Sequence, residues 1–164
     1  YTTNCVDSSH AGGTDIIISK LSEDGTTLIG STFIGGSSND GLNQNANLKY
    51  NYSDDFRGDV ITDELGNIYV ATTTLSGDII TKNASQSTKN SAYDGLIFEL
   101  APDCKTLNWL TYFGGNGSEA LYSIKLDNQN NTNGQKNCIL NSELKIFLQD
   151  LHILYVQEVV THFI

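Results

Sequence analysis

The chain has 164 residues, enough for one ordinary domain, and 38% of them are apolar, enough for a packed core. Its 9 basic and 19 acidic residues give a net charge of −10, which would repel nucleic-acid phosphates and an anionic membrane surface. The composition therefore excludes a disordered chain and argues against nucleic acid as a partner.

Turn-forming residues dominate the polar part of the chain, with 15 Gly, many Asn, Ser and Thr, and only 17% charged residues. This composition is typical of turn-rich β proteins and suits an extracellular or cell-surface location. The chain opens on Tyr1, contains no Met and has no apolar run of about 18 residues, so we expect a fragment of a longer protein without a membrane span.

An internal repeat is the most informative feature. Residues 15–40 align without a gap to residues 94–119 at an offset of 79, with 9 identities in 26 columns. The identities are Asp15/Asp94, Ile18/Ile97, Leu21/Leu100, Asp24/Asp103, Thr27/Thr106, Leu28/Leu107, Thr32/Thr111, Gly35/Gly114 and Gly36/Gly115. A fixed period indicates units that bury an apolar face against their neighbours.

Each copy predicts a β-hairpin. The strand, turn and strand fall at 15–21, 22–26 and 27–34 in the first copy and at 94–100, 101–105 and 106–113 in the second. A glycine pair ends each hairpin, Gly35-Gly36 and Gly114-Gly115, and we expect a sharp turn with at least one positive φ in each pair.

A polar insert at 43–58 follows the first hairpin, and a second strand pair at 59–62 and 67–73 comes next. The turn between these strands, 63–66, predicts a positive φ at Gly66. Four strands per copy predict two four-stranded sheets packed face to face. Ile16, Ile18, Ile97 and Leu107 are expected between them.

The second copy continues with a strand at 121–127 and then departs from the pattern. The remaining tail, 132–164, predicts a helix at 144–151 followed by a strand at 153–160. A terminal cap, a divergent segment and an out-of-frame sequence all fit this tail.

The order of these features resembles the bacterial SBBP repeat, named for the seven-bladed beta-propeller. The resemblance covers about residues 1–131 and is carried by 15–22 (DIIISKLS), 28–37 (LIGSTFIGGS), 63–78 (DELGNIYVATTTLSGD), 94–101 (DGLIFELA) and 107–116 (LNWLTYFGGN). It implies an all-β partial propeller of antiparallel four-stranded blades. On this reading 1–13 ends a preceding blade, 14–92 is the first unit with its insert, 93–131 is an incomplete second unit and 132–164 is divergent.

Catalytic residues are not indicated. His10, His152 and His162 are isolated from one another, and no nucleophile or phosphate-binding motif is present. Asp54, Asp55, Asp59 and Glu119 could supply a glycosidase pair, but they fall in polar loops without apolar neighbours to raise a pKa. We expect no catalytic, cofactor or metal-binding residues.

Calcium and disulfides are weaker alternatives. Asp24-Gly25, Asp54-Asp55 and Asp127–Asn131 have suitable oxygens for calcium, but none has the spacing of a calcium loop, and ordinary Asx turns explain them more simply. Cys5, Cys104 and Cys138 are odd in number and widely spaced, so free thiols are expected and a single bridge stays an alternative.

The insert offers the one binding surface that the sequence suggests. Tyr50 and Tyr52 lie near Asn45 and Asn47, a composition used to bind sugars or protein surfaces, but we expect these tyrosines to pack within their own loop.

These features lead to two alternative hypotheses for the function of the chain. The first is a non-catalytic propeller module of a secreted or cell-surface bacterial protein, used as a scaffold, for adhesion or for ligand binding, with neighbouring blades as its main partners. The second is a fragment of a propeller-fold hydrolase or lyase acting on carbohydrate.

Overall fold

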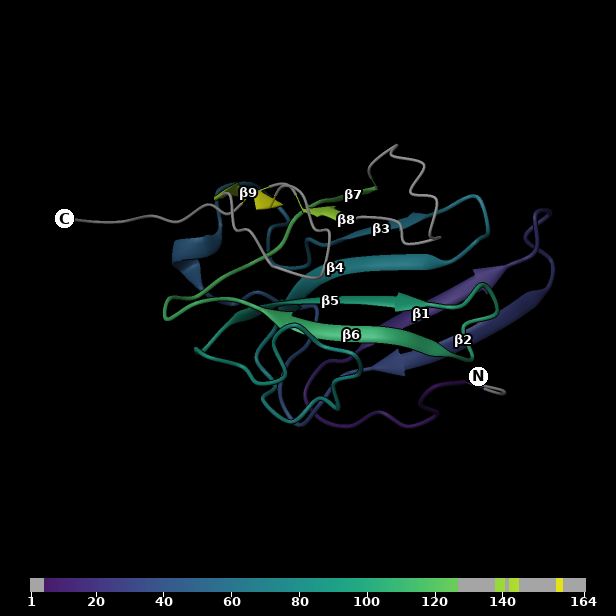
Figure 1. Ribbon diagram of the computed structural model, residues 1–164, viewed down its shortest axis with the longest axis horizontal. Helices are drawn as coiled ribbons and strands as arrows, with labels where there is room; N and C mark the ends of the chain where they lie inside the picture. Colours follow the sequence, from purple (N-terminus) through teal and green to yellow (C-terminus); the bar gives the residue numbers. More distant parts are fainter. Residues whose placement is uncertain (1–4, 127–137, 141, 145–155, 158–164) are drawn as a thin grey trace.

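The computed structural model describes residues 5–126, 138–140, 142–144 and 156–157. In these residues the fold is all-β, as predicted, with antiparallel strands and one short 3-10 helix, η1 (Ala46–Leu48) (Figure 1). The strands are β1 (Ile16–Leu21), β2 (Leu28–Ile34), β3 (Asp59–Thr62), β4 (Ile68–Thr74), β5 (Asp94–Leu100), β6 (Leu107–Phe113), β7 (Ile124–Leu126), β8 (Cys138–Leu140), β9 (Ser142–Leu144) and β10 (Val156–Gln157).

One four-stranded antiparallel sheet, in the order β3-β4-β5-β6, forms the centre of the described structure. The prediction that each copy makes its own four-stranded sheet is therefore wrong, because β3 and β4 follow the first hairpin in sequence but pair with the second. Strands β4 and β5 are buried along nearly their whole length, which suits them to the middle of a sheet. The first hairpin, β1–β2, stays a separate two-stranded sheet.

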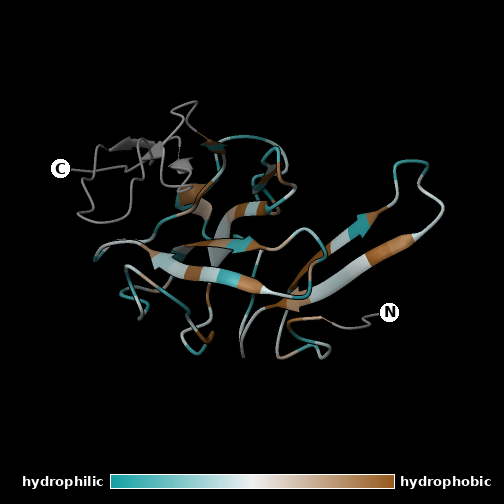
Figure 2. Ribbon diagram, turned by 45° about the vertical axis from the view of Figure 1, so that its right-hand side comes forward, coloured by the Kyte–Doolittle hydropathy of each residue, from teal (hydrophilic) through white to brown (hydrophobic). Residues whose placement is uncertain are grey.

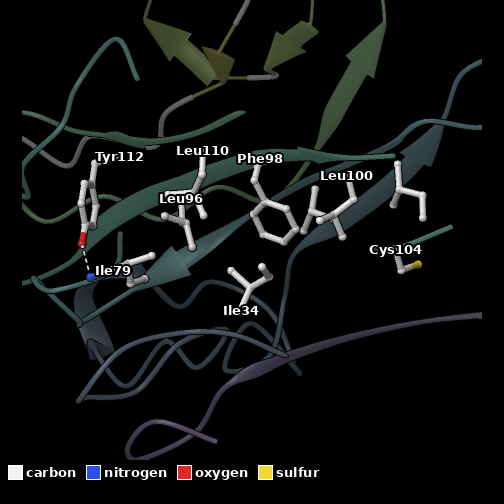
Figure 3. Packing of buried hydrophobic residues seen from close by; sticks show 10 residues of the cluster. Ile34, Ile79, Leu96, Phe98, Leu100, Cys104, Leu110 and Tyr112 are labelled. Atoms are coloured by element: carbon white, nitrogen blue, oxygen red, sulfur yellow. Dashed lines mark hydrogen bonds between the residues drawn. The ribbon is translucent and has the colours of Figure 1, made fainter. Parts of the chain in front are cut away.

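The hairpin β1–β2 covers one face of the central sheet (Figure 3). The buried residues between them are Ile34, Ile68, Val70, Ile79, Leu96, Phe98, Leu100, Cys104, Leu110 and Tyr112. Ile16, Ile18 and Leu107 pack against this cluster, as predicted. Burial of these side chains is the main favourable term that holds the hairpin on the sheet.

The opposite face of the sheet packs against β7 and the segment before it. Tyr69, Ala71, Ile97, Phe113, Leu121 and Ile124 form this second buried cluster. The prediction for Ile97 is wrong, because successive side chains of a strand point to opposite faces and its neighbours Leu96 and Phe98 face the first hairpin. Each face of the central sheet thus carries a buried apolar cluster.

The two hairpins share their local structure in detail. A bulge lies between Lys20 and Leu21 in β1 and between Glu99 and Leu100 in β5, at equivalent positions. The amide of Phe33 donates to the carbonyl of Asp7 at 3.1 Å, and the equivalent amide of Tyr112 donates to Gln86 at 3.1 Å. The repeat therefore extends upstream to residues 7 and 86, beyond the segment with clear sequence identity.

The glycine pairs serve a different purpose from the one predicted. Gly66 has the expected positive φ of 83°, but none of Gly35, Gly36, Gly114 and Gly115 has a positive φ. A Cβ on Gly35 would lie 2.6 Å from Cγ of Asp15, and one on Gly114 would lie 2.5 Å from Oε2 of Glu119. Close approach of buried carboxylates, rather than backbone conformation, thus requires glycine at both positions.

The predicted C-terminal helix, 144–151, and strand, 153–160, lie mostly outside the described residues. The described parts of the tail 132–164 are β8, which pairs with β7, and β9 and β10, which pair with each other in antiparallel fashion.

Candidate functional site

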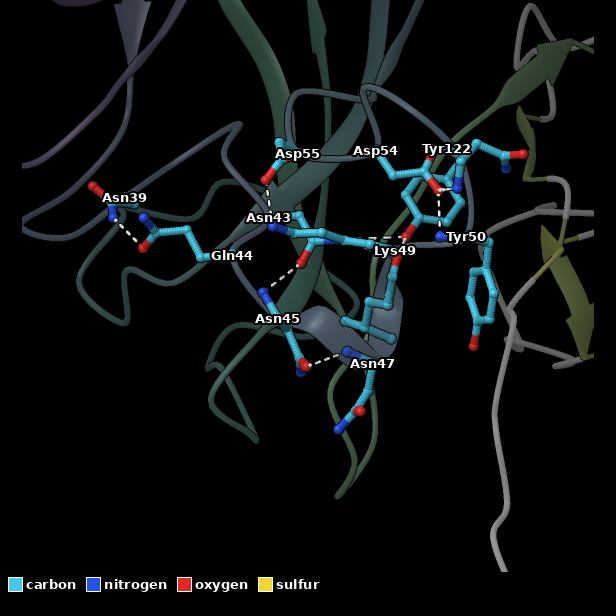
Figure 4. A network of polar contacts seen from close by, with 12 residues as sticks. Asn39, Asn43, Gln44, Asn45, Asn47, Lys49, Tyr50, Asp54, Asp55 and Tyr122 are labelled. Carbon is cyan, nitrogen blue, oxygen red and sulfur yellow. Dashed lines mark hydrogen bonds and ion pairs between the residues drawn. The ribbon is translucent and has the colours of Figure 1, made fainter.

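Asn43 anchors the insert 43–58 from within (Figure 4). Its side chain is almost fully buried, and its Nδ2 donates to the carbonyl of Leu48 at 3.2 Å and to the hydroxyl of Tyr122 at 3.4 Å. Its backbone amide donates to the carbonyl of Asp55 at 2.7 Å. Asn43 therefore joins the two ends of the loop through its backbone amide, and its side chain joins the loop to Tyr122 in the second copy of the repeat.

Asp54 is the second anchor. Its buried carboxylate accepts hydrogen bonds from the amides of Tyr50 and Asn51, both at 2.7 Å, and from Nη1 of Arg57 at 3.2 Å. Burial acts to raise the pKa of Asp54, but the two amides and the Arg57 charge outweigh it and hold the pKa below its usual value. The group stays ionised and is unsuited to act as a general acid.

Tyr122 closes the loop from the side of β7. Its hydroxyl donates to the carbonyl of Leu48, and the guanidinium of Arg57 lies 4.9 Å from the centre of its ring. Burial, with the nearby Asp54 charge, raises the pKa of Tyr122 to about 12. The loop is therefore held by a hydrogen-bond and cation–π network at its base.

The same network leaves three aromatic side chains facing solvent. Tyr52 is 100% exposed, Phe56 is 74% exposed and Tyr50 is 49% exposed. An ordered loop that presents aromatic rings is a surface on which sugars or apolar protein groups can stack. The expectation that Tyr50 and Tyr52 pack within their own loop is therefore wrong, and Phe56 was missed although it is an aromatic residue within the same polar insert.

The two predicted amide residues of the site have different surroundings. Asn45 caps η1, with its Oδ1 accepting from the amide of Asn47 at 3.0 Å, so this oxygen has a structural role. The side chain of Asn47 is exposed beside it. Asn47 is thus the amide better placed to meet a ligand.

The structure assigns separate local roles to the carboxylates considered for glycosidase chemistry. Asp55 pairs with Lys49, while Oδ2 of Asp59 accepts from the amide of Ile124 at 3.1 Å and so joins β3 to β7. Glu119 is buried beside Gly114. Asp54 and Glu119 lie in loops, as expected, but both are buried, and burial acts to raise the pKa of Asp54 although its hydrogen bonds outweigh it.

The described residues considered for calcium binding instead form hydrogen bonds within their own turns. Oδ1 of Asp24 accepts from Ser22 Oγ at 2.6 Å and from the Thr26 amide at 3.1 Å, and these bonds lower the pKa of Asp24. Residues 127–131 lie outside the described part of the chain. Among the residues that the structure describes, no three His, Cys, Asp or Glu side chains come together in a way that could hold a metal ion.

The remaining reactive groups are dispersed. Cys5 and Cys104 are free thiols, and burial raises the pKa of Cys104. Nε2 of His10 lies 3.2 Å from the carbonyl of Gly13 in an exposed segment. His152 and His162, and the side chain of Cys138, lie outside the described residues.

Comparison with known protein families and with curated proteins gives no match for this chain. Within the described residues, no helix has the length and apolar character needed to cross a membrane.

Proposed function

We propose that this chain is a non-catalytic β-propeller repeat module of a secreted or cell-surface bacterial protein, with a scaffold, adhesion or ligand-binding role. The observation that supports this role best is the packing of two copies of one hairpin in adjacent layers, with β1–β2 lying on the sheet that contains β5–β6. Units that pack on their neighbours in this way can continue into a larger array.

The ligand-binding part of the proposal depends on the insert. Tyr50, Tyr52 and Phe56 are exposed on a loop whose base is fixed by Asn43, Asp54 and Tyr122. A fixed loop loses little conformational entropy on binding, which favours recognition over a mobile loop of the same composition. A carbohydrate or an apolar protein surface is the partner that fits exposed aromatic rings.

A propeller-fold hydrolase or lyase acting on carbohydrate is the second candidate. Asp54 and Asp55 are neighbours in the same loop as the exposed aromatic residues, which is the observation in its favour. Against it, Asp54 is held ionised by three donors and Asp55 is paired with Lys49, so each carboxylate already has a structural partner.

Binding and turnover measurements separate the two functions. The labelled chain is applied to arrays of glycans and extracellular proteins, beside the double variant Tyr52→Ala/Phe56→Ala and the control Ile80→Ala, whose side chain is 86% exposed elsewhere. Binding that only the loop variant loses supports the module. Turnover of a glycoside panel that disappears in Asp54→Ala or Asp55→Ala would instead establish the enzyme.

A further inference from the structure

Within the described residues one edge of strand β1 has no partner strand, although the same edge of its repeat counterpart, β5, pairs with β4. Strand β5 pairs with β6 on one side and with β4 on the other, with Ala71 opposite Ile97 and Thr72 opposite Leu96. Within the described residues β1 pairs only with β2, and the equivalents of Leu96 and Ile97 are Ile17 and Ile18. The backbone groups on the other edge of β1 are therefore available to a further strand.

The side chains of β1 alternate between the central sheet and the outer face of the hairpin. Ile16 and Ile18 face the central sheet, whereas Ile17 and Leu21 point away from it and are 55% and 54% exposed. Their repeat equivalents Leu96 and Leu100 are both 0% exposed because the first hairpin packs on them. The side chains of β1 that a strand on its open edge would extend toward the central sheet are therefore Ile16 and Ile18.

The two strands β1 and β2 also leave part of the central sheet uncovered. Each strand spans only about 5 Å in the hydrogen-bonding direction, so two strands cannot cover a sheet of four. A groove of about 500 Å³ lies along β1 over the uncovered part, and Ile16, Ile18, Phe56, Val60, Val70 and Thr72 contribute to its lining. Val60, on strand β3, is 57% exposed there.

We propose that the edge of β1 and this groove bind an antiparallel β-hairpin of the β3–β4 type, which completes a second four-stranded sheet over the existing one. The inference rests on the repeat-module role proposed above and names the partner that the module accepts. In the register of β4 on β5, the docked strand places the equivalents of Tyr69 and Ala71 on the groove side, next to Ile18. Tyr69 and Ala71 already pack in this way against β7 on the other face.

The outer surface of the hairpin does not offer the same match. Apolar residues lie along both strands toward the tip of the hairpin (Figure 2), but the cross-strand pair Phe98 and Leu110 of the second copy is replaced by Ser19 and Ser31, which hydrogen-bond to each other at 2.8 Å. The far edge of β2 is occupied by the chain's own segment at Asp7. The edge of β1 and its groove are therefore the docking surface.

The repeat itself supplies the experiment. Residue 83 corresponds to position 4 at the offset of 79, so a copy of residues 58–83 is fused directly ahead of Cys5 in the otherwise complete chain. The fusion recreates the covalent order β3–β4–β5–β6 around β1 and β2. Hydrogen exchange of the peptide that contains β1, and the melting temperature, are compared with those of the unextended chain.

We expect exchange within β1 to slow at least tenfold and the melting temperature to rise. A matched extension that carries Tyr69→Asp and Ala71→Asp in the added copy alone should give neither effect, because it places carboxylates in an apolar groove. Val60→Asp in the chain itself alters an exposed side chain and should also prevent the gain.

Unchanged exchange in β1 with the unmodified extension, or equal protection by the two extensions, would overturn the proposal. If the extension slows exchange in β1 but the chain binds nothing on the arrays, the ligand-binding role of the insert is rejected and the docking of a hairpin is supported. If the chain binds on the arrays but the extension does not slow exchange in β1, the docking is rejected and the ligand-binding role is supported.

Discussion

Gly25 and Cys104 hold the same position in two copies of one hairpin turn, and both adopt the left-handed conformation, with φ of 73° and 61°. Their amides donate to the carbonyls of Ser22 and Ala101, at 2.8 and 3.0 Å. Cysteine tolerates this conformation less well than glycine, but its side chain is fully buried in the core cluster. The turn of the second copy thereby packs against Gly30 in β2.

Gly25→Ala and Gly30→Ala should separate backbone strain from steric collision. A Cβ on Gly25 meets nothing within 4 Å, so its cost is the positive φ alone, about 1 kcal/mol. A Cβ on Gly30 would collide with the carbonyl oxygen of Asp103, and we expect a loss of about 2–3 kcal/mol. Urea unfolding measures both values. Equal losses would contradict the packing of the second turn on β2.

Asp94→Asn should destabilise the protein more than Asp15→Asn, by about 1–2 kcal/mol. Asp94 accepts hydrogen bonds from Gln86 Nε2 at 2.9 Å and from Ser91 Oγ at 2.7 Å, and also from the amides of residues 90 and 91. Asp15 accepts from the amide of Ala11 at 2.8 Å, and within the described structure its buried Oδ1 has no hydrogen-bond partner. Thermal melts of the two variants test the order, and a larger loss for Asp15→Asn would contradict it.

Asp7→Gln should stabilise the first copy, by about 1 kcal/mol. Gln86, at the equivalent position, donates to Asp94 and accepts from the amide of Gly114 at 3.0 Å. An amide at position 7 would make the corresponding bonds to the buried side chain of Asp15 and to Gly35, in place of the two exposed bonds at 2.9 Å that the Asp7 carboxylate accepts from Ser9. Asp7→Asn, one carbon shorter, is the matched control. A lower melting temperature for Asp7→Gln than for the native chain would show that position 7 does not act as position 86 does.

The insert should loosen under acid. The pKa of Asp54 is held below its usual 3.8, so its stabilising effect is complete above that value and is lost as pH falls through the lowered pKa. The amide proton shifts of Tyr50 and Asn51, which donate to this carboxylate, should titrate with a midpoint below 3.8. Asp54→Asn should abolish that titration and a midpoint above 3.8 would contradict the assignment.

Ionisation of Tyr122 should lower the stability of the folded protein at high pH. Its pKa is raised to about 12 from the usual 10.0, so the folded protein retains a proton that the unfolded chain releases. Stability should therefore fall between pH 10 and 12, and Tyr122→Phe should remove this part of the fall at a cost of about 1 kcal/mol for the lost hydrogen bond to Leu48. Urea unfolding of both proteins at several pH values in this range measures the effect. The same dependence of the unfolding free energy on pH in both proteins would contradict the prediction.

The local elements were largely readable from the residues. Alternating and β-branched runs marked β1, β2, β5 and β6, and the Asp63–Gly66 turn between β3 and β4 needed only the positive φ of Gly66. The aromatic composition of the insert also pointed to Tyr50 and Tyr52. The anchors Asn43 and Tyr122 were not readable, because they act across 79 residues of sequence.

The sequence by itself determined the repeat, the hairpins and the all-β class, because these depend on side-chain period and on turn residues that act locally. Only the tertiary structure decided that β4 pairs with β5 across the boundary between the two copies, and that Ile97 faces away from Ile18. It also decided that Gly35 and Gly114 make room for Asp15 and Glu119 instead of reversing the chain. Sheet order and close approach are contacts between distant segments, and many local patterns are compatible with more than one such arrangement.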